Sequence, residues 1–214
     1  MAIIGKQVNG ISPHFTKEMG FEALSRMGIS GKIPRVADIG GGRGELTKLL
    51  SPRCDKIWLV DYSPPSQNDV PSNVTLLQQD LNSPWDLPGN HFDCVFSLEC
   101  IEHIENPRHF MREMCRITKP GGYLFVSTPN NHSLVSKMTF LLRGQHRFFQ
   151  QASYPAHCTP LLKCDLEWMA AENKMQFHSW VYSNWDRLPV VNIPMKIPGS
   201  HFSQSLGILL RKSE

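Results

Sequence analysis

The feature that most constrains this sequence is an apolar run that passes through several glycines into a helical pattern, Val36-Ala37-Asp38-Ile39-Gly40-Gly41-Gly42-Arg43-Gly44-Glu45-Leu46. Glycine permits positive φ and lets a ligand approach the backbone, and the N-terminus of the following helix offers free N–H groups to an anion. The pattern therefore predicts a buried strand, a tight turn and a helix, with an anionic group bound at the turn. A strand-to-helix corner that binds no ligand is the alternative interpretation.

Acidic residues after the next two apolar runs suggest what the anionic ligand is. The turn departs from the dinucleotide pattern GxGxxG, because Gly40 and Gly42 are in register but Glu45 stands at the last glycine position. Asp61 lies 21 residues beyond Gly40 and can accept hydrogen bonds from two vicinal ribose hydroxyls. Asp80 follows the third run and is placed to accept from an adenine amino group. These positions predict a bound nucleoside, and Glu45 disfavours an NAD oxidoreductase.

The rest of the chain alternates short β-rich runs with helical patterns, which is typical of a parallel sheet with crossover helices. Strands are expected at residues 35–39, 56–60, 74–78, 92–97, 123–127, 176–184 and 204–210. Helix starts are expected at Ser12-Pro13, Asn106-Pro107 and Thr159-Pro160. Three prolines between Asp61 and Val74 predict that the helix there is short or absent. We expect an N-terminal helical flap at 1–33 and one domain at 34–214.

Charge, hydropathy and cysteine spacing exclude several classes of protein. The formal net charge of +3 is too small to argue for a nucleic-acid partner. No apolar run reaches the 18 or more residues of a membrane span, and the first ten residues do not resemble a signal peptide. The six cysteines include no CxxC pair. We therefore expect a cytoplasmic protein with reduced thiols, no membrane span and no nucleic-acid partner.

From about residue 34 to 210, the sequence resembles the class I S-adenosylmethionine-dependent methyltransferases. The matching segments are ADIGGGRGE, LVD at 59–61, QQDL at 78–81, FDCVFSLECIEHIENP at 92–107 and ITKPGGYLFVSTPN at 117–130. The resemblance implies an α/β fold, a Rossmann-like three-layer sandwich with a seven-stranded, mostly parallel sheet whose last strand is antiparallel. It also implies that S-adenosylmethionine lies across the carboxyl ends of the first strands.

The same resemblance implies a role for each residue at that edge. Asp38, Gly40 and Gly42 would hold the methionine part, Asp61 the ribose with Tyr62 as a further contact, and Asp80 with Leu81 the adenine. The short connection after Asp61 would leave the adenosine side of the pocket less enclosed than is usual in the family.

A second motif, Glu99-Cys100-Ile101-Glu102-His103, indicates where the methyl acceptor binds. On a helical turn, the spacings i, i+3 and i+4 would bring Glu99, Glu102 and His103 to one side. Such a group suits either a metal site rich in oxygen ligands or a histidine base oriented by a carboxylate. An EH pair that only caps the following helix is the structural alternative.

This motif looks like the pattern in two methyltransferase groups that use a divalent metal, the ubiquinone-biosynthesis O-methyltransferases and the small-RNA 2′-O-methyltransferases. Carried over, Glu99, Glu102 and His103 match their metal ligands, and His157 is the best candidate for a fourth, with His132 as its competitor. Two carboxylates without a thiolate favour Mg²⁺ over zinc. Without metal, His103 and Glu102 would be the catalytic residues, with His103 as the base.

We therefore predict a methyltransferase that methylates an oxygen of a hydroxylated small molecule or glycan. The segment 143–149, RGQHRFF, follows an amphipathic stretch with Leu134, Met138 and Leu141, at a place where this family recognises substrates. Its basic and aromatic side chains could hold an acceptor, or it could be a solvated loop. The alternatives are a 2′-O-methyltransferase acting on RNA and a catalytically silent nucleoside-binding scaffold.

Overall fold

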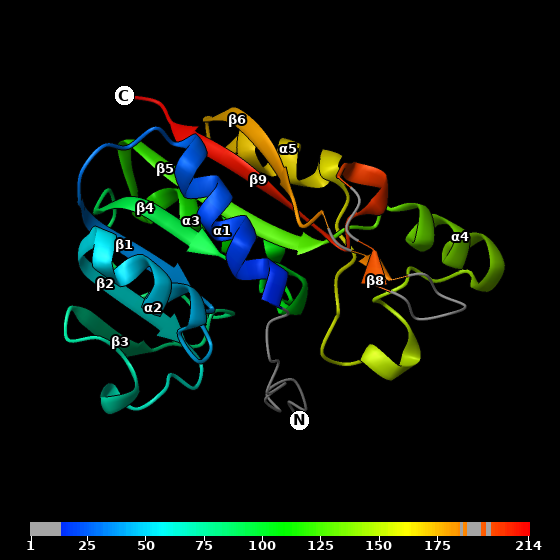
Figure 1. The fold of residues 1–214 in the computed structure, drawn as a ribbon, viewed down its shortest axis with the longest axis horizontal. Coiled ribbons are helices and arrows are strands. Elements are labelled where there is room, and N and C mark those ends of the chain that lie inside the picture. Colours follow the sequence, from blue (N-terminus) through cyan, green and yellow to red (C-terminus); the bar gives the residue numbers. More distant parts are fainter. Residues whose placement is uncertain (1–13, 185, 188–193, 196–197) are drawn as a thin grey trace.

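One mixed seven-stranded sheet organises the molecule (Figure 1). The computed structural model describes residues 14–184, 186–187, 194–195 and 198–214. Among them, the sheet has the strand order β3-β2-β1-β4-β5-β9-β6, and β9 is the strand that runs opposite to the other six. The strands are β1 (Ile33–Ile39), β2 (Cys54–Asp61), β3 (Val74–Gln78), β4 (Phe92–Ser97), β5 (Thr118–Pro129), β6 (Met175–Tyr182) and β9 (Ser205–Lys212). The predicted fold class is confirmed.

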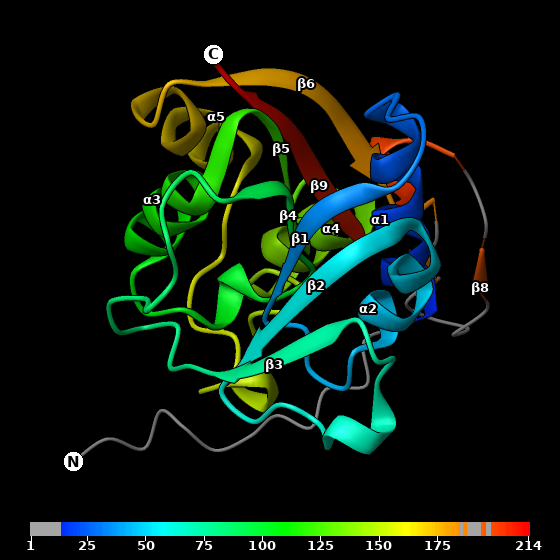
Figure 2. The ribbon, with the colours of Figure 1, turned by 90° about the vertical axis from the view of Figure 1, so that its left-hand side faces the viewer.

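Helices cover both faces of this sheet and make it a three-layer sandwich (Figure 2). One face carries α1 (His14–Arg26) and α2 (Glu45–Leu50), and the other carries α3 (Pro107–Ile117) and α5 (Lys163–Glu172). Two buried apolar clusters fill the two spaces between sheet and helices. Every residue of β4 is buried, as expected for a central parallel strand packed on both faces.

The N-terminal helix α1 is part of the core. Its Met19, Ala23 and Leu24 are buried in the same cluster as Val36 of β1. The predicted helix start at Ser12-Pro13 lies outside the described residues, as does most of the N-terminal half of the predicted flap. The division into a flap at 1–33 and a domain at 34–214 stays a prediction.

The other helix boundaries follow from local capping. In α3, the Asn106 side chain accepts a hydrogen bond from the His109 N–H at 3.0 Å, and Pro107 occupies the first turn, as predicted. The predicted start of α5 at Thr159-Pro160 is wrong. That helix begins at Lys163, where the Asp165 carboxylate accepts a hydrogen bond from the Leu162 N–H. Capping by an acidic side chain in the first turn thus overrides the proline.

The remaining elements are short. The connection after β2 contains only the single 3₁₀ turn η2 (Gln67–Asp69), which confirms the missing helix. Further 3₁₀ turns are η1 (Ser51–Arg53), η3 (Ile101–His103), η4 (Gln151–Ser153) and η5 (Ser200–Phe202), and a small ladder pairs β7 (Asp186–Arg187) with β8 (Pro194–Met195). The helix α4 (Leu134–Arg143) lies beyond the carboxyl edge of β5. In the described part of the chain, no helix combines the length and hydropathy needed to cross a bilayer.

Candidate active site

The glycine turn between β1 and α2 has the backbone conformation that its sequence predicts. Gly40, Gly42 and Gly44 have φ values of 71°, 52° and 75°, and residues other than glycine adopt such positive values only at a cost in free energy. A Cβ at Gly40 would lie 2.4 Å from the Cys100 Sγ, whereas a Cβ at Gly42 would meet no protein atom within 4 Å. Gly40 is therefore needed for packing, and Gly42 leaves its side of the turn open for a ligand.

Two carboxylates hold this turn in place. The Asp61 Oδ2 accepts a hydrogen bond from the Gly42 N–H at 2.9 Å, and its Oδ1 accepts one from the Ser63 N–H at 2.9 Å. The Asp38 Oδ2 accepts a hydrogen bond from the Thr47 hydroxyl at 2.6 Å. Burial raises the pKa of Asp38 to about 6, so a cationic ligand such as an amino group would favour its ionised form.

The residues predicted to contact the adenine follow the end of β3. Asp80 is exposed, and its carboxylate accepts hydrogen bonds from the Asn82 N–H and, at 3.4 Å, from the Ser83 hydroxyl. Leu81 is buried and lies near the position that a Cβ on Gly40 would occupy. Tyr62 is 54% exposed. The structure thus places all the predicted cofactor residues at the carboxyl ends of β1, β2 and β3.

The acceptor motif does not form the predicted helical turn. Glu99 has a positive φ of 49°, and only residues 101–103 form the 3₁₀ turn η3. The Glu99 carboxylate instead accepts hydrogen bonds from the hydroxyls of Ser127 and Ser205, both at 2.9 Å. The geometry predicted from i, i+3 and i+4 spacing is therefore wrong for Glu99, because one residue in the left-handed region turns the chain before the helical turn begins.

The other three predicted residues are brought together. Single ligand atoms of Glu102, His103 and His157 lie within 4.8 Å of one another, and the two imidazole rings are 4.7 Å apart. His103 donates from Nδ1 to the Ala156 carbonyl at 2.7 Å, and His157 donates from Nδ1 to the Phe148 carbonyl at 2.8 Å. Because these bonds fix the tautomer, both Nε2 atoms remain as acceptors.

Burial determines the charge of this cluster. It lowers the pKa of His103 and of His157 below 6.5, so both rings are neutral at pH 7. Glu102 is 1% exposed and accepts a hydrogen bond from the Thr128 hydroxyl at 3.2 Å. Burial, and then the neighbouring Glu99, raise the pKa of Glu102 well above 4.5, and burial raises that of Glu99 to about 7.

The donor set does not fit the predicted Mg²⁺. Mg²⁺ prefers an oxygen-rich octahedral site, whereas the cluster offers one carboxylate and two imidazoles, and Glu99 is hydrogen-bonded to two serines. Such a set suits a borderline cation such as Zn²⁺, and the backbone bonds to both Nδ1 atoms are the outer contacts that metal-bound histidines usually make. His132, the alternative candidate for a fourth ligand, does not belong to this cluster. Its Nε2 accepts a hydrogen bond from the Lys163 N–H at 3.1 Å.

Several residues of the site gave no signal in the sequence. Thr47, Ser127, Thr128 and Ser205 hold the carboxylates, but hydroxyl residues at strand ends are too common to single out. Phe149, in the predicted recognition segment, lies with its ring 5.4 Å from that of His157. The segment 143–149 therefore reaches the acceptor side of the site.

The packing at Gly40 gives a stability prediction. Gly40→Ala is expected to lower the free energy of unfolding by about 3–5 kcal/mol, from backbone strain plus overpacking against Cys100. Gly28→Ala is the matched control, because Gly28 has a φ of 64° but no atom within 4 Å of the added Cβ, so it should lose only about 1–2 kcal/mol. If urea unfolding showed that both variants lose the same free energy of unfolding, the packing role of Gly40 would be refuted.

Comparison with known proteins assigns this chain to a family. The sequence profile of the family described as "Methyltransferase domain" matches residues 13–181. Among curated proteins, the chain is 27% identical over 128 residues to the mitochondrial ubiquinone biosynthesis O-methyltransferase of Dictyostelium discoideum, covering 59% of this chain and 36% of that one. It is 37% identical over 122 residues to the ubiquinone/menaquinone biosynthesis C-methyltransferase of Pseudomonas fluorescens, covering 48% and 45%. The chain thus spans about a third to a half of these relatives.

Solved structures agree with the fold. A protein of Bacillus halodurans superposes with a TM-score of 0.66 at 14% identity, covering 91% of this chain and 98% of that one. The N-methyltransferase NodS of Bradyrhizobium japonicum, in complex with S-adenosyl-L-homocysteine, superposes with a TM-score of 0.61 at 16% identity, covering 95% and 90%. With the family profile, these results show that the chain belongs to the class I S-adenosylmethionine-dependent methyltransferase family.

Proposed function

We propose that this protein transfers the methyl group of S-adenosylmethionine to a hydroxyl oxygen of a small molecule or glycan. The observation that carries this proposal is the neutral His103, whose Nε2 stays free as an acceptor because its Nδ1 is bonded to the Ala156 carbonyl. An alcohol must lose its proton as its oxygen attacks, and a positioned neutral imidazole can take that proton. We place the reaction in the cytoplasm, which the six free cysteines support.

In the proposed step, the acceptor oxygen forms a bond to the methyl carbon while the bond from that carbon to sulfur breaks. The sulfonium becomes neutral S-adenosylhomocysteine, and the hydroxyl proton goes to the His103 Nε2. The protein supplies no nucleophile, so alignment of the two substrates and exclusion of water would account for much of the rate. The ubiquinone O-methyltransferase relatives support oxygen as the acceptor atom.

Glu102, His103 and His157 could alternatively hold a borderline divalent cation. When bound, such an ion would polarise the acceptor hydroxyl and lower its pKa. His103 would then be a ligand, and the backbone bonds of both histidines would orient their Nε2 atoms toward the ion.

Ligand-dependent stability tests the cofactor assignment. We expect S-adenosylmethionine and S-adenosylhomocysteine to raise the melting temperature and NAD to leave it unchanged. At a ligand concentration of 100 times Kd, the stabilisation should be about 2.7 kcal/mol. Absence of a shift with both sulfur ligands would remove the enzyme proposal. A shift without turnover in a broad screen of hydroxylated acceptors, followed as S-adenosylhomocysteine release, would indicate the silent scaffold.

A further inference from the structure

A buried ion pair joins the predicted recognition segment to the C-terminal part of the chain. The Arg147 guanidinium pairs with the Asp186 carboxylate, and the two side chains are 18% and 1% exposed. Asp186 lies 39 residues after Arg147, in the short β7–β8 ladder outside the main sheet. Two charges lose their hydration when they are buried, so a buried ion pair usually adds little net stability. The pair is therefore better explained by what it holds in place.

Arg147 lies next to the backbone group that orients His157. Its guanidinium carbon lies over the Phe148 ring, 5.1 Å from the ring centre. The Phe148 carbonyl accepts the hydrogen bond from Nδ1 of His157 at 2.8 Å. The His157 ring in turn lies 4.7 Å from the ring of His103. A continuous series of contacts thus leads from Asp186 through Arg147 and Phe148 to the two histidines of the candidate active site.

The backbone of Arg147 makes only neutral contacts. Its N–H donates to the Ser136 hydroxyl of α4 at 3.4 Å, and its carbonyl accepts a hydrogen bond from the Gln150 side chain at 3.1 Å. A hydrogen bond between two charged groups is about twice as strong as one between neutral groups. Of these three contacts, the bond to Asp186 is therefore the one that holds the segment most firmly.

The state of the His157 ring depends on the position of the Phe148 carbonyl. A neutral imidazole carries its proton on either nitrogen, and the hydrogen bond made by one nitrogen decides which form is present. While the carbonyl accepts from Nδ1, Nε2 of His157 remains an acceptor. In that form Nε2 can accept a hydrogen bond from the methyl acceptor or bind a cation. If the carbonyl moved, the ring could rotate or place its proton on Nε2 instead.

We propose that Asp186 is a positioning residue for methyl transfer. By pairing with Arg147, it fixes the Phe148 carbonyl, which holds His157 in the form with its proton on Nδ1. This inference rests on the proposed function for the use of His157 in the reaction, but the form of the ring can be measured without a methyl acceptor. Loss of a group that orients a functional histidine from behind typically lowers activity 10–100-fold.

Nitrogen-15 spectra of the histidine rings test the proposal. Wild-type protein saturated with S-adenosylhomocysteine, above pH 7 where both rings are neutral, should show His157 as one tautomer with its proton on Nδ1. In Asp186→Asn, His157 should populate both tautomers, whereas His103 should keep its own because its Nδ1 bonds to Ala156. With an acceptor from the screen described above, kcat of Asp186→Asn should fall about tenfold, with unchanged affinity for S-adenosylmethionine.

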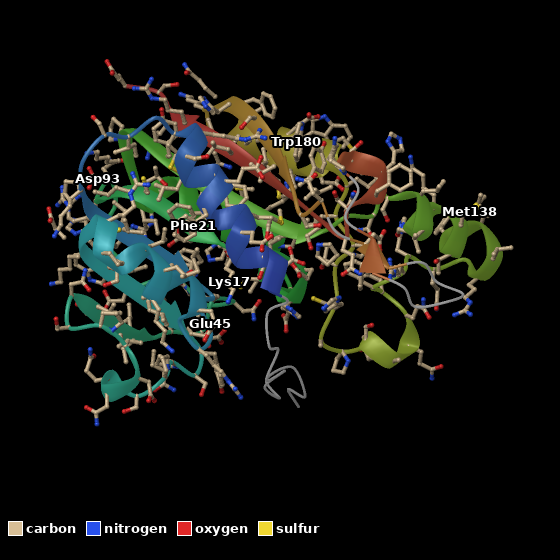
Figure 3. All side chains as sticks on the ribbon, in the orientation of Figure 1. Lys17, Phe21, Glu45, Asp93, Met138 and Trp180 are labelled. Atoms are coloured by element: carbon tan, nitrogen blue, oxygen red, sulfur yellow. The ribbon has the colours of Figure 1, made fainter. Side chains whose placement is uncertain are left out.

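Asp93→Asn is the matched control. The Asp93 carboxylate is 8% exposed, pairs with Lys119 and accepts a hydrogen bond from the Arg35 N–H at 3.0 Å. Figure 3 shows Asp93 at the end of the molecule opposite to α4. This variant should lose stability but keep a single His157 tautomer and the wild-type kcat. An equal mixture of tautomers in both variants would mean that Asp186 acts through general stability, and would overturn the proposal.

A double variant separates positioning from stability. In Asp186→Val/Arg147→Met, two apolar side chains replace the buried ion pair, a change that is often neutral or stabilising. We expect this protein to unfold in urea close to the wild-type midpoint and to show both His157 tautomers. A single tautomer with the proton on Nδ1, in this variant or in folded Asp186→Asn, would overturn the proposal.

The cofactor assignment and the proposed function can fail separately from this inference. The cofactor residues lie at the ends of β1, β2 and β3, so both Asp186 variants should keep the wild-type thermal shift with S-adenosylhomocysteine. Unchanged His157 tautomers in an active methyltransferase would refute the positioning role alone. Absence of turnover in wild-type protein would refute the proposed function, and a mixture of tautomers in the variants would still show that Asp186 controls the His157 ring.

Discussion

Asp61→Ala is expected to lower the affinity for S-adenosylmethionine by at least about 100-fold. Each carboxylate oxygen of Asp61 accepts one backbone N–H, from Gly42 or from Ser63, and keeps a lone pair that can accept from a ribose hydroxyl. Hydrogen bonds to a charged group contribute about 1.5–3 kcal/mol each, so loss of two ribose contacts accounts for that factor. Alanine also leaves the Gly42 and Ser63 N–H groups without an acceptor, which loosens the turn.

Calorimetric titration with S-adenosylmethionine measures this effect. Asp69→Ala is the charge-matched control, because Asp69 is an exposed acid on η2 after the same strand, and it should keep wild-type affinity. Asp80→Ala removes a single exposed acceptor and should cost about tenfold. Wild-type affinity in a folded Asp61→Ala protein would contradict the ribose assignment. An equal loss with Asp69→Ala would show that general electrostatics, and not a specific contact, is responsible.

The grouping of the predicted cofactor residues at the carboxyl ends of β1, β2 and β3 could be predicted from the sequence, because it depends on strand direction. Apolar runs gave the buried parallel strands, and the carboxyl ends of parallel strands meet at one edge, so Asp38 and Asp61 had to lie near the glycine turn. The glycine spacing identified the turn itself, since positive φ at Gly40, Gly42 and Gly44 needs that residue type. No tertiary contact was needed for these conclusions.

The acceptor side depended on information that spacing does not contain. A single positive φ at Glu99 directs its carboxylate to Ser127 and Ser205, and a glutamate gives no sign that it will adopt that conformation. His157 comes from a loop 54 residues after His103, and sequence alone could not choose between it and His132. Periodicity identified α4 as amphipathic but could not show that its apolar side faces solvent.

His103→Ala is expected to lower kcat by about 100-fold or more, with little change in affinity for S-adenosylmethionine. The reason is that the His103 Nε2 is the proposed proton acceptor, whereas its Nδ1 bond to the Ala156 carbonyl only orients the ring. Burial lowers the pKa of His103, so the protonated, inactive form accumulates only below pH 6.5. The acid limb of the wild-type kcat profile should therefore lie below pH 6.5 and be absent from the residual activity of the variant.

His178→Ala, which changes an exposed histidine on β6, should keep wild-type kcat. Equal turnover of His103→Ala and wild type would leave His103 only a structural role, its hydrogen bond to the Ala156 carbonyl. The effect of a chelator on kcat then distinguishes His103 acting as a base from His103 acting as a metal ligand. If His103 acts as the base, chelator treatment should leave kcat unchanged. If Glu102, His103 and His157 hold a cation, chelation should abolish turnover and Zn²⁺ should restore it better than Mg²⁺, because two of the three donors are imidazole nitrogens.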